Sequence, residues 1–241
     1  MEGRHREVDV REIINAILYV LRSGCAWRLL PHEFPNWKTV YGIFRGWRDD
    51  GTWQAIHDSL RDKLRRKESR KTSPSAAIID SQTVKTTEVG GERGYDAAKK
   101  VNGRKRHIVV DTLGLILAVV VHSANVQDYE GAVLVLGILG RLKARFHRLK
   151  VIFADSAYGR NNLPECVQDA FGWLLQTVLR PVNVKGFVVL PKRWIVERTF
   201  GWLGRYRRHS KDYERNTASS EAMIYLAMSH IMLRRLARAK S

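Results

Sequence analysis

Cysteine is scarce in this sequence. Cys25 and Cys166 are the only two among 241 residues, and neither belongs to a CxxC pair or to a Cys/His group with ligand spacing. Because zinc sites and disulfide frameworks need such patterns, we expect neither, and a reducing cytoplasm suits the chain. Apolar runs of about 18 residues are also missing, and the first residues, MEGRHREVDVRE, are charged. We therefore expect a soluble intracellular protein with no membrane span and no signal peptide.

Acidic residues are few compared with basic ones. The chain has 24 Asp and Glu against 42 Lys and Arg, which gives a formal net charge of +18. So large an excess favours a polyanionic partner such as nucleic acid, although a ribosomal or merely soluble basic protein would share it. With 44% hydrophobic and 27% charged residues the chain is globular rather than disordered, and it is long enough for one domain plus a smaller one.

Three acidic residues lie in segments whose apolar pattern predicts burial, where a charged side chain is unusual. Asp80 interrupts the apolar run AAIIDSQTV of residues 76–84, which is rich in β-branched residues and predicts a core strand. Asp155 ends a second apolar strand, VIFAD, and Glu197 lies in a segment whose apolar residues recur at helical spacing. A charge near the interior is costly unless it is paired or binds a metal. Two strand aspartates and a helix glutamate are typical of a site that holds two divalent cations for phosphoryl displacement.

The expected order of elements brings these acids together. We expect strands at residues 76–84, 106–111, 115–122, 150–155 and 173–179, and helices at 129–146, 161–170, from 191 through 197, and 217–239. A strand, helix, strand crossover makes neighbouring strands parallel, which places Asp80 and Asp155 at the same carboxyl edge. The order is that of an α/β, ribonuclease H-like fold with a mixed five-stranded sheet flanked by helices. Residues 182–190 could add a small strand.

Asp111 resembles Asp80 locally but is expected in a turn. The apolar runs around it predict a hairpin, so its strand runs antiparallel to the Asp80 strand and ends at the opposite edge. Residues 88–103, before this hairpin, are polar and glycine-rich and predict a loop. Basic residues crowd the end of that loop, where they would dock a phosphate or form plain solubilising surface. These are Lys99, Lys100, Arg104, Lys105 and Arg106.

Residues 1–71 are expected to form a small all-helical domain. Its amphipathic helices are predicted at residues 8–22, 37–49 and 52–66. Three short helices joined by such turns suggest a helix-turn-helix-like DNA-binding module, although its basic residues could equally form a solvated face. Those of the middle helix are Lys38, Arg45 and Arg48. The charge run RDKLRRKESRK and the turn after it predict a boundary with a second domain at residues 72–241.

The segment around Glu197 is basic and carries two glycines. Gly201 and Gly204 share the helix face of Glu197, which would let a DNA backbone or the sheet edge come close. A plainer alternative is that Glu197 pairs with Arg193 or Arg198 on a wet surface. The basic residues expected to contact DNA here are Arg193, Arg205, Arg207, Arg208 and Lys211. The closing helix should cover the sheet and turn outward Arg234, Arg235 and Arg238.

Three motifs in order resemble those of insertion-sequence DDE transposases. They are IIDSQTVKTT followed by GRKRHIVVDTLGL around Asp80, FADSAYG around Asp155, and RWIVERTFGWLGRYRRHSKDYE around Glu197. The resemblance is greatest to the family named after insertion sequence five, whose N-terminal helical domain is similar to SGCAWRLLPHEFPNWKTVYGIFRGW. It covers nearly the whole chain. Family members carry extra residues before the segment that resembles Arg4 onward, so the chain looks N-terminally shortened.

The resemblance implies a catalytic site and a reaction. Asp80, Asp155 and Glu197 would be the catalytic residues and would hold two ions of Mg²⁺ or Mn²⁺. The enzyme would cut transposon ends and join the freed 3′ hydroxyl to target DNA, in the bacterial cytoplasm at the nucleoid. Its partners would be terminal inverted repeats, target DNA and a second copy in a synaptic homodimer. Of the Tyr, Arg, Glu, Lys signature of related elements, Arg193 and Glu197 match, whereas Leu190 and Gly204 depart from it.

Two alternatives remain open at this point. The first is a non-catalytic DNA-binding protein derived from a shortened or domesticated transposase, which would use the basic surface alone. The second is a ribonuclease H-like nuclease that cuts DNA without joining the cut 3′ ends to a second duplex. A metal titration with end-labelled DNA separates the first from an active enzyme, and a strand-transfer assay separates the second.

Overall fold

The structure is a computed structural model that describes residues 9–178 and 192–238. Its helices are α1 (Val10–Ser23), α2 (Trp37–Asp49), α3 (Thr52–Lys67), α4 (Asp128–Arg141), α5 (Leu163–Phe171), α6 (Arg193–Leu203) and α7 (Thr217–Ala237). Its strands are β1 (Ala76–Lys85), β2 (Gly94–Asp96), β3 (Val101–Asp111), β4 (Ile116–Ser123), β5 (Val151–Ala154) and β6 (Leu174–Thr177). The small strand predicted at 182–190 and the helix start predicted at Pro191 lie outside the described residues.

Local sequence signals explain where several helices begin and end. The side chain of Asp9 caps the first turn of α1, and Gly24 ends that helix in the left-handed conformation at φ +73°. Asn36 caps α2, and Gln127 and Glu130 form a reciprocal capping box at the start of α4. Within the two described ranges, every helix is too short or too polar to cross a membrane.

A mixed sheet of six strands runs in the order β2, β3, β1, β5, β6, with β4 paired to β3. β3 is antiparallel to β1 and β4, whereas β5 runs parallel to both β1 and β6. The predicted ribonuclease H-like α/β fold is confirmed, but the predicted number of five strands is wrong. β2 and the start of β3 occupy the predicted loop at 88–103. Glycines in this segment permit close pairing of strands: a Cβ on Gly103 of β3 would lie 1.9 Å from the carbonyl oxygen of Val84 in β1.

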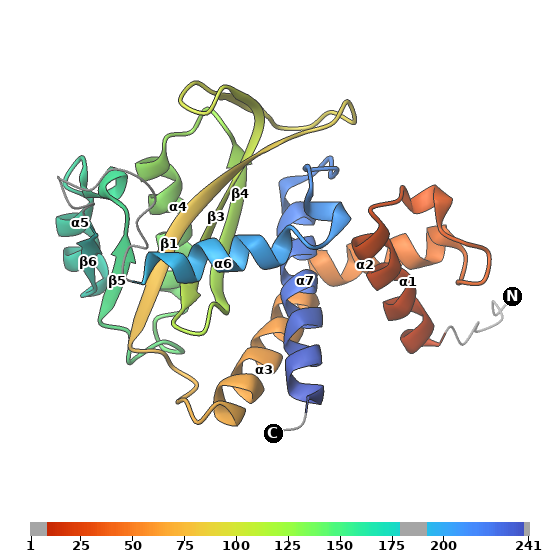
Figure 1. Ribbon diagram of the computed structural model, residues 1–241, viewed down its shortest axis with the longest axis horizontal. Coiled ribbons are helices and arrows are strands. Elements are labelled where there is room, and N and C mark those ends of the chain that lie inside the picture. Colours follow the sequence, from red (N-terminus) through yellow and green to blue (C-terminus); the bar gives the residue numbers. More distant parts are fainter. Residues whose placement is uncertain (1–8, 179–191, 239–241) are drawn as a thin grey trace, which may run out of the picture.

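Alternate residues of the strands pack into two hydrophobic cores, one on each face of the sheet. Ile78 of β1 and Phe153 of β5 belong to the core shared with α1, α2, α3, α6 and α7. Their neighbours Ala77 and Ile152 belong to the core shared with α4 and α5. In Figure 1, α6 crosses the sheet in front of β1 and α4 lies behind it. The position of a residue along β1 or β5 therefore decides whether its side chain faces α6 or α4.

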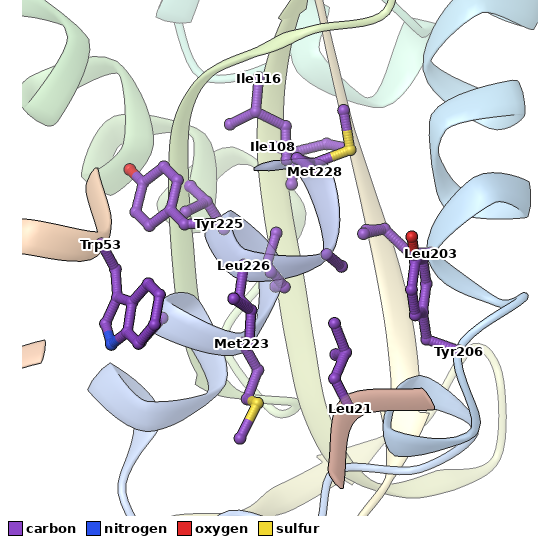
Figure 2. Packing of buried hydrophobic residues seen from close by; sticks show 14 of the residues in the cluster. Leu21, Trp53, Ile108, Ile116, Leu203, Tyr206, Met223, Tyr225, Leu226 and Met228 are labelled. Atoms are coloured by element: carbon purple, nitrogen blue, oxygen red, sulfur yellow. The ribbon is translucent and has the colours of Figure 1, made fainter. Parts of the chain in front are cut away.

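The three N-terminal helices contribute to the larger core. Leu21 of α1 and Trp53 of α3 meet side chains of β3, β4, α6 and α7 there (Figure 2). α3 also packs along α7, next to which it lies in Figure 1. The predicted domain boundary at residue 71 falls in the turn between α3 and β1, and it stays a prediction.

The charge run at the end of α3 is not a solvated linker. Arg61 is fully buried and pairs with Asp58 at 2.8 Å and Asp62 at 3.1 Å. One turn later Arg65 is buried as well, and it pairs with Asp111. Since these arginines are four residues apart, they share the inner face of a helix, which the charge count alone does not reveal.

Candidate active site

β1 and β5 bring Asp80 and Asp155 to one edge of the sheet. The strands are parallel and pair Ile78 with Phe153, and the same register carried two residues further sets Asp80 opposite Asp155. Because Ile78 and Phe153 contribute to the core under α6, the residues two positions on face α6 as well. The predicted parallel relation of the two strands is confirmed, and it places both carboxylates beside the same helix.

One oxygen of each strand aspartate is held by the main chain. Oδ1 of Asp80 accepts the N–H of Ser81 at 2.8 Å, and Oδ1 of Asp155 accepts the N–H of Ala157 at 2.8 Å. The second contact caps the short 3₁₀ turn that follows β5. Each aspartate therefore keeps Oδ2 for a partner on the α6 side.

That partner is a single guanidinium nitrogen at the start of α6. Nη2 of Arg193 lies 3.8 Å from Oδ2 of Asp80, 3.8 Å from Oδ2 of Asp155 and 3.7 Å from Oε1 of Glu197. These distances are longer than hydrogen bonds, so the contacts are electrostatic. Glu197 does pair with Arg193, as the plainer alternative expected, but the same cation also faces both aspartates. The three acids predicted from the sequence converge on one point.

Burial raises the pKa of the Asp80 carboxyl to about 6. The N–H of Ser81 and the charge of Arg193 favour the ionised form, whereas the nearby charge of Asp155 adds to the increase. Desolvation is thus the largest effect on this group, and one guanidinium shared by three carboxylates does not offset it. A buried carboxyl in this position gains from additional positive charge.

The donor set suits Mg²⁺ or Mn²⁺, because hard divalent cations prefer carboxylate oxygens. In this conformation, however, Arg193 takes the central place. No group of three or more His, Cys, Asp or Glu among the described residues is arranged to hold a metal ion. The residue types therefore fit divalent cations, but the guanidinium must withdraw before all three carboxylates can bind one.

A second polar network supports β1 from the α4 side. Ser81, which follows Asp80 and faces the opposite way, donates its hydroxyl to Asp128 at 3.1 Å, and the ammonium of Lys105 pairs with the same oxygen at 3.1 Å. Tyr158 is buried nearby, and burial raises its pKa well above the ordinary value, with Asp80 adding to the effect. Sequence reasoning missed Asp128, although an acid directly before the helix predicted at 129–146 was the available signal.

Asp111 lies away from this cluster. It pairs across the sheet with Ala77, three residues before Asp80 and towards the other end of β1. Its carboxylate accepts amides of its own turn, among them that of Leu113 at 2.8 Å, and it pairs with Arg65. The interpretation of Asp111 as a turn residue is confirmed.

Four basic residues expected on a DNA-contacting surface are buried, and for them the expectation is wrong. They are Arg104, Lys105, Arg106 and Arg208. Arg104 and Arg106 on β3 are 0% and 2% exposed, and their guanidinium groups donate to main-chain carbonyls of residues 209–215. Lys105 and Arg208 likewise donate to carbonyls inside the fold. These side chains anchor distant segments of the chain, a role that a count of charges does not predict.

The other basic residues predicted to contact DNA differ in how exposed their side chains are. Those that stay predicted DNA contacts on exposed positions are Lys38, Arg45, Lys99, Lys100, Arg205, Arg207 and Lys211. Arg48 is mostly covered, pairs with Asp49 at 2.7 Å and donates to the hydroxyl of Ser219 at 2.8 Å. Gly201 is exposed, and a Cβ there would meet nothing within 4 Å. The open strip expected beside Glu197 is therefore present.

Comparison with known proteins adds independent information. The family described as "Transposase DDE domain" matches residues 71–232, and the family described as "Putative transposase of IS4/5 family" matches residues 1–57. The "Putative transposase for insertion sequence element IS402" of Burkholderia cepacia is 28% identical over 172 residues, which are 70% of this chain and 79% of that protein. The "Insertion element IS402 uncharacterized 16.2 kDa protein" of the same organism is 32% identical over 89 residues, 36% of this chain and 59% of that protein.

The first family match covers about two thirds of the chain and includes Asp80, Asp155 and Glu197. In the structure these acids come from β1, from the residue that follows β5 and from α6 of a ribonuclease H-like fold, and they converge on one cation. The resemblance found in the sequence motifs is thereby confirmed. This chain belongs to the insertion-sequence DDE transposases, a family of DNA transposases.

Proposed function

We propose that this protein cuts the ends of a transposon and joins the freed 3′ hydroxyl to target DNA by metal-dependent phosphoryl transfer. One observation carries the proposal: the carboxylates of Asp80 in β1, Asp155 directly after β5 and Glu197 in α6 all lie within 3.8 Å of Nη2 of Arg193. Acids far apart in the sequence share one cation. Bringing three carboxylates together costs free energy unless cations offset their charge, and such costly clusters are typical of functional sites.

Asp80, Asp155 and Glu197 are the proposed catalytic residues. They would hold two ions of Mg²⁺ or Mn²⁺, which when bound supply an activated water and stabilise charge on the phosphodiester oxygens. Asp80 and Asp155 are oriented by main-chain N–H groups on a rigid sheet edge, which favours precise positioning. Glu197 is 49% exposed on α6 and approaches from the side open to solvent. Arg193, once it leaves the acids, would bind a phosphate oxygen of the DNA.

DNA is the proposed partner, as transposon terminal inverted repeats and as target. The net charge of +18 and the exposed basic residues, of which Lys99 is near enough to offset part of the rise in the pKa of Asp80, support attraction to a polyanion. A homodimer is the proposed assembly in the synaptic complex, because two transposon ends must be held together while each is cut.

Asp155→Asn tests the catalytic assignment. Asparagine keeps an oxygen that accepts the N–H of Ala157, so the turn after β5 is retained while the charge is lost. We expect cleavage of end-labelled terminal-repeat DNA with Mg²⁺ or Mn²⁺ to fall by at least about 1000-fold, or about 4 kcal/mol of transition-state stabilisation. DNA binding should stay at the wild-type level.

The matched control is Asp169→Asn, which removes an exposed carboxylate on α5 and should cleave normally. Cleavage by the Asp155 variant near the wild-type rate contradicts the assignment. A wild-type protein that cuts but never joins 3′ ends to a second duplex supports the nuclease alternative. A wild-type protein that binds DNA without cutting it in either metal supports the non-catalytic alternative.

A further inference from the structure

A strongly basic pocket lies at the far end of α6 from the acids. Its volume is about 310 Å³, and it is walled by α1, by the chain that follows α6 and by the last turns of α7. Among the described residues its lining contains no Asp or Glu. The arginines that line it are Arg22, Arg205, Arg234, Arg235 and Arg238.

Few of these cations are neutralised within the protein. Arg235 pairs with Glu68 at 3.3 Å, and Arg22 donates weakly to the carbonyl oxygen of Arg205 at 3.4 Å. Within residues 9–178 and 192–238, the side chains of the other three arginines form no hydrogen bond or ion pair. Five guanidinium groups around one small space repel each other, so the pocket attracts an anion.

Two aromatic rings hold part of the pocket in place. The guanidinium of Arg22 lies 5.7 Å from the ring centre of Tyr206, and that of Arg235 lies 5.9 Å from the ring centre of Trp202. Figure 2 shows Tyr206 beside Leu203 and Leu21, where the same ring closes one side of the core. An arginine held near an aromatic ring can still donate its N–H groups, and Arg22 and Arg235 each use only one guanidinium nitrogen in hydrogen bonds to the residues that the structure describes. Both cations therefore keep N–H groups for a phosphate.

A partly exposed row of side chains on α6 runs from this pocket towards the active site. The guanidinium of Arg198 lies 4.6 Å from the ring centres of both Trp194 and Trp202, so three side chains stack along one side of α6. Trp194 is 42% exposed and follows Arg193 directly. From Trp194 to Trp202 the helix rises about 12 Å, which is a few nucleotides along a DNA strand.

We infer that the arginine pocket binds backbone phosphates of duplex DNA beside the position that is cut. The inference rests on the proposed function, because it makes the pocket an anchor for DNA whose scissile phosphate lies at the acids. The proposed contacts are to phosphates, because several guanidinium groups around one pocket suit an anion. They contribute to affinity for any DNA sequence.

The double variant Arg234→Ala with Arg238→Ala tests this inference. Both residues are exposed at the end of α7, so their removal should leave the fold intact, as the thermal unfolding midpoint will show. Binding of the full chain to a fluorescently labelled DNA duplex is measured by anisotropy in EDTA over a range of salt concentrations. Loss of two phosphate contacts should lower the slope of log affinity against log salt by roughly 1.8 and weaken binding at least about tenfold at 0.1 M salt.

Two further variants make the result specific. Arg141→Ala with Lys143→Ala removes the same charge from exposed positions at the end of α4, on the other face of the sheet, and should change the slope much less. Arg234→Lys with Arg238→Lys keeps the charge and should restore the slope. If the double alanine variants in the pocket and at the end of α4 have equal slopes of log affinity against log salt, the inference is wrong. It is also wrong if millimolar inorganic phosphate shifts the NMR signals of the pocket arginines while DNA does not.

The Asp155→Asn protein separates this inference from the proposed function. That variant should keep the wild-type salt slope although it no longer cuts DNA. A difference in salt slope between the two double alanine variants supports DNA binding by the pocket even if neither the wild-type protein nor any variant cleaves DNA. Conversely, if the wild-type protein cleaves DNA and the two double alanine variants have equal salt slopes, the pocket does not bind DNA but the catalytic proposal still holds.

Discussion

Glu221, in the first turns of α7, is a carboxylate that pairs with no cation in the described part of the chain. Its Oε1 accepts the N–H of Val121 at 2.9 Å, and burial raises its pKa from the ordinary 4.5 to about 7. Between these pH values the folded chain holds a proton that the unfolded chain has released. The contribution of Glu221 to the free energy of unfolding therefore decreases as the pH rises from about 4.5 to about 7.

Glu221→Gln should remove this pH dependence. A glutamine oxygen still accepts the N–H of Val121, but there is no charge to desolvate, so the variant should be more stable than wild type at pH 8 and similar to it at pH 4. The gain should be at most about 3 kcal/mol, measured as the free energy of unfolding in urea at each pH. Exposed Glu88→Gln is the control and should show no such difference. An unchanged stability at pH 8 would contradict the raised pKa.

Residues differ in how well their burial can be predicted from the surrounding sequence. Asp80 could be selected because one acid interrupts an apolar, β-branched run, where a charge is conspicuous. Glu221 stands in TASSEAMIY, a mixed segment in which an acid is unremarkable, and only the packing of α7 against β4 buries it. Arg104 and Arg106 were misjudged for the same reason, since basic residues at the end of a polar segment are typical of surface.

Asp111 and Arg65 connect two elements, the β3 to β4 hairpin and α3. Both side chains are buried, and their ion pair lies where α3 meets the sheet. Asp111 also accepts the N–H of Leu113 and holds the turn. Breaking a buried pair leaves an uncompensated charge, which costs more than the pair itself contributes.

Asp111→Asn should therefore destabilise the protein by about 3–5 kcal/mol. Asparagine retains the turn acceptor, so the loss arises mainly from the unpaired Arg65, and chemical denaturation measures it. The double variant Arg65→Met with Asp111→Asn should recover part of that stability, because it removes the stranded cation. Equal stability of the single and double variants would show that the charge of Arg65 is not responsible.

Elements were predicted best where the apolar pattern is local and strong. α2 begins and ends at the predicted residues, and both strands that carry the aspartates were expected. β2 was missed because its three residues, which begin with Gly94, are too few to show alternation. Its pairing sets Gly94 opposite Gly103 of β3, where neither position leaves room for a Cβ. Such a strand is specified by its neighbour and not by its own sequence.

At the scale of the whole molecule, the N-terminal helices and the sheet share one core. Ile17, Leu21, Trp53 and Leu64 are buried in the same cluster as Ile108 of β3. Burial of each large side chain contributes roughly 1.5–3 kcal/mol, so the sheet loses much of its stability without these helices.

A fragment of residues 72–241 should therefore fail to unfold cooperatively, although the sequence suggested a domain boundary at its start. Thermal circular dichroism, together with binding of a dye that reports exposed apolar surface, compares it with the full chain. We expect a broad, shallow transition and strong dye binding for the fragment. A sharp transition near that of the full chain would instead support two independently folding domains.

The sequence by itself was enough to select the acids that are proposed to carry the chemistry and to predict the local elements that hold them. Asp80, Asp155 and Glu197 could be chosen from alternation, helical spacing and motif order, because these patterns express short-range backbone geometry. Only the tertiary structure decided that Arg193 lies among the three acids and that arginines of α1, α7 and the turn after α6 gather around one pocket. It also decided which basic side chains are buried. These outcomes depend on segments far apart in the chain meeting across the sheet, and no local pattern encodes where such segments meet.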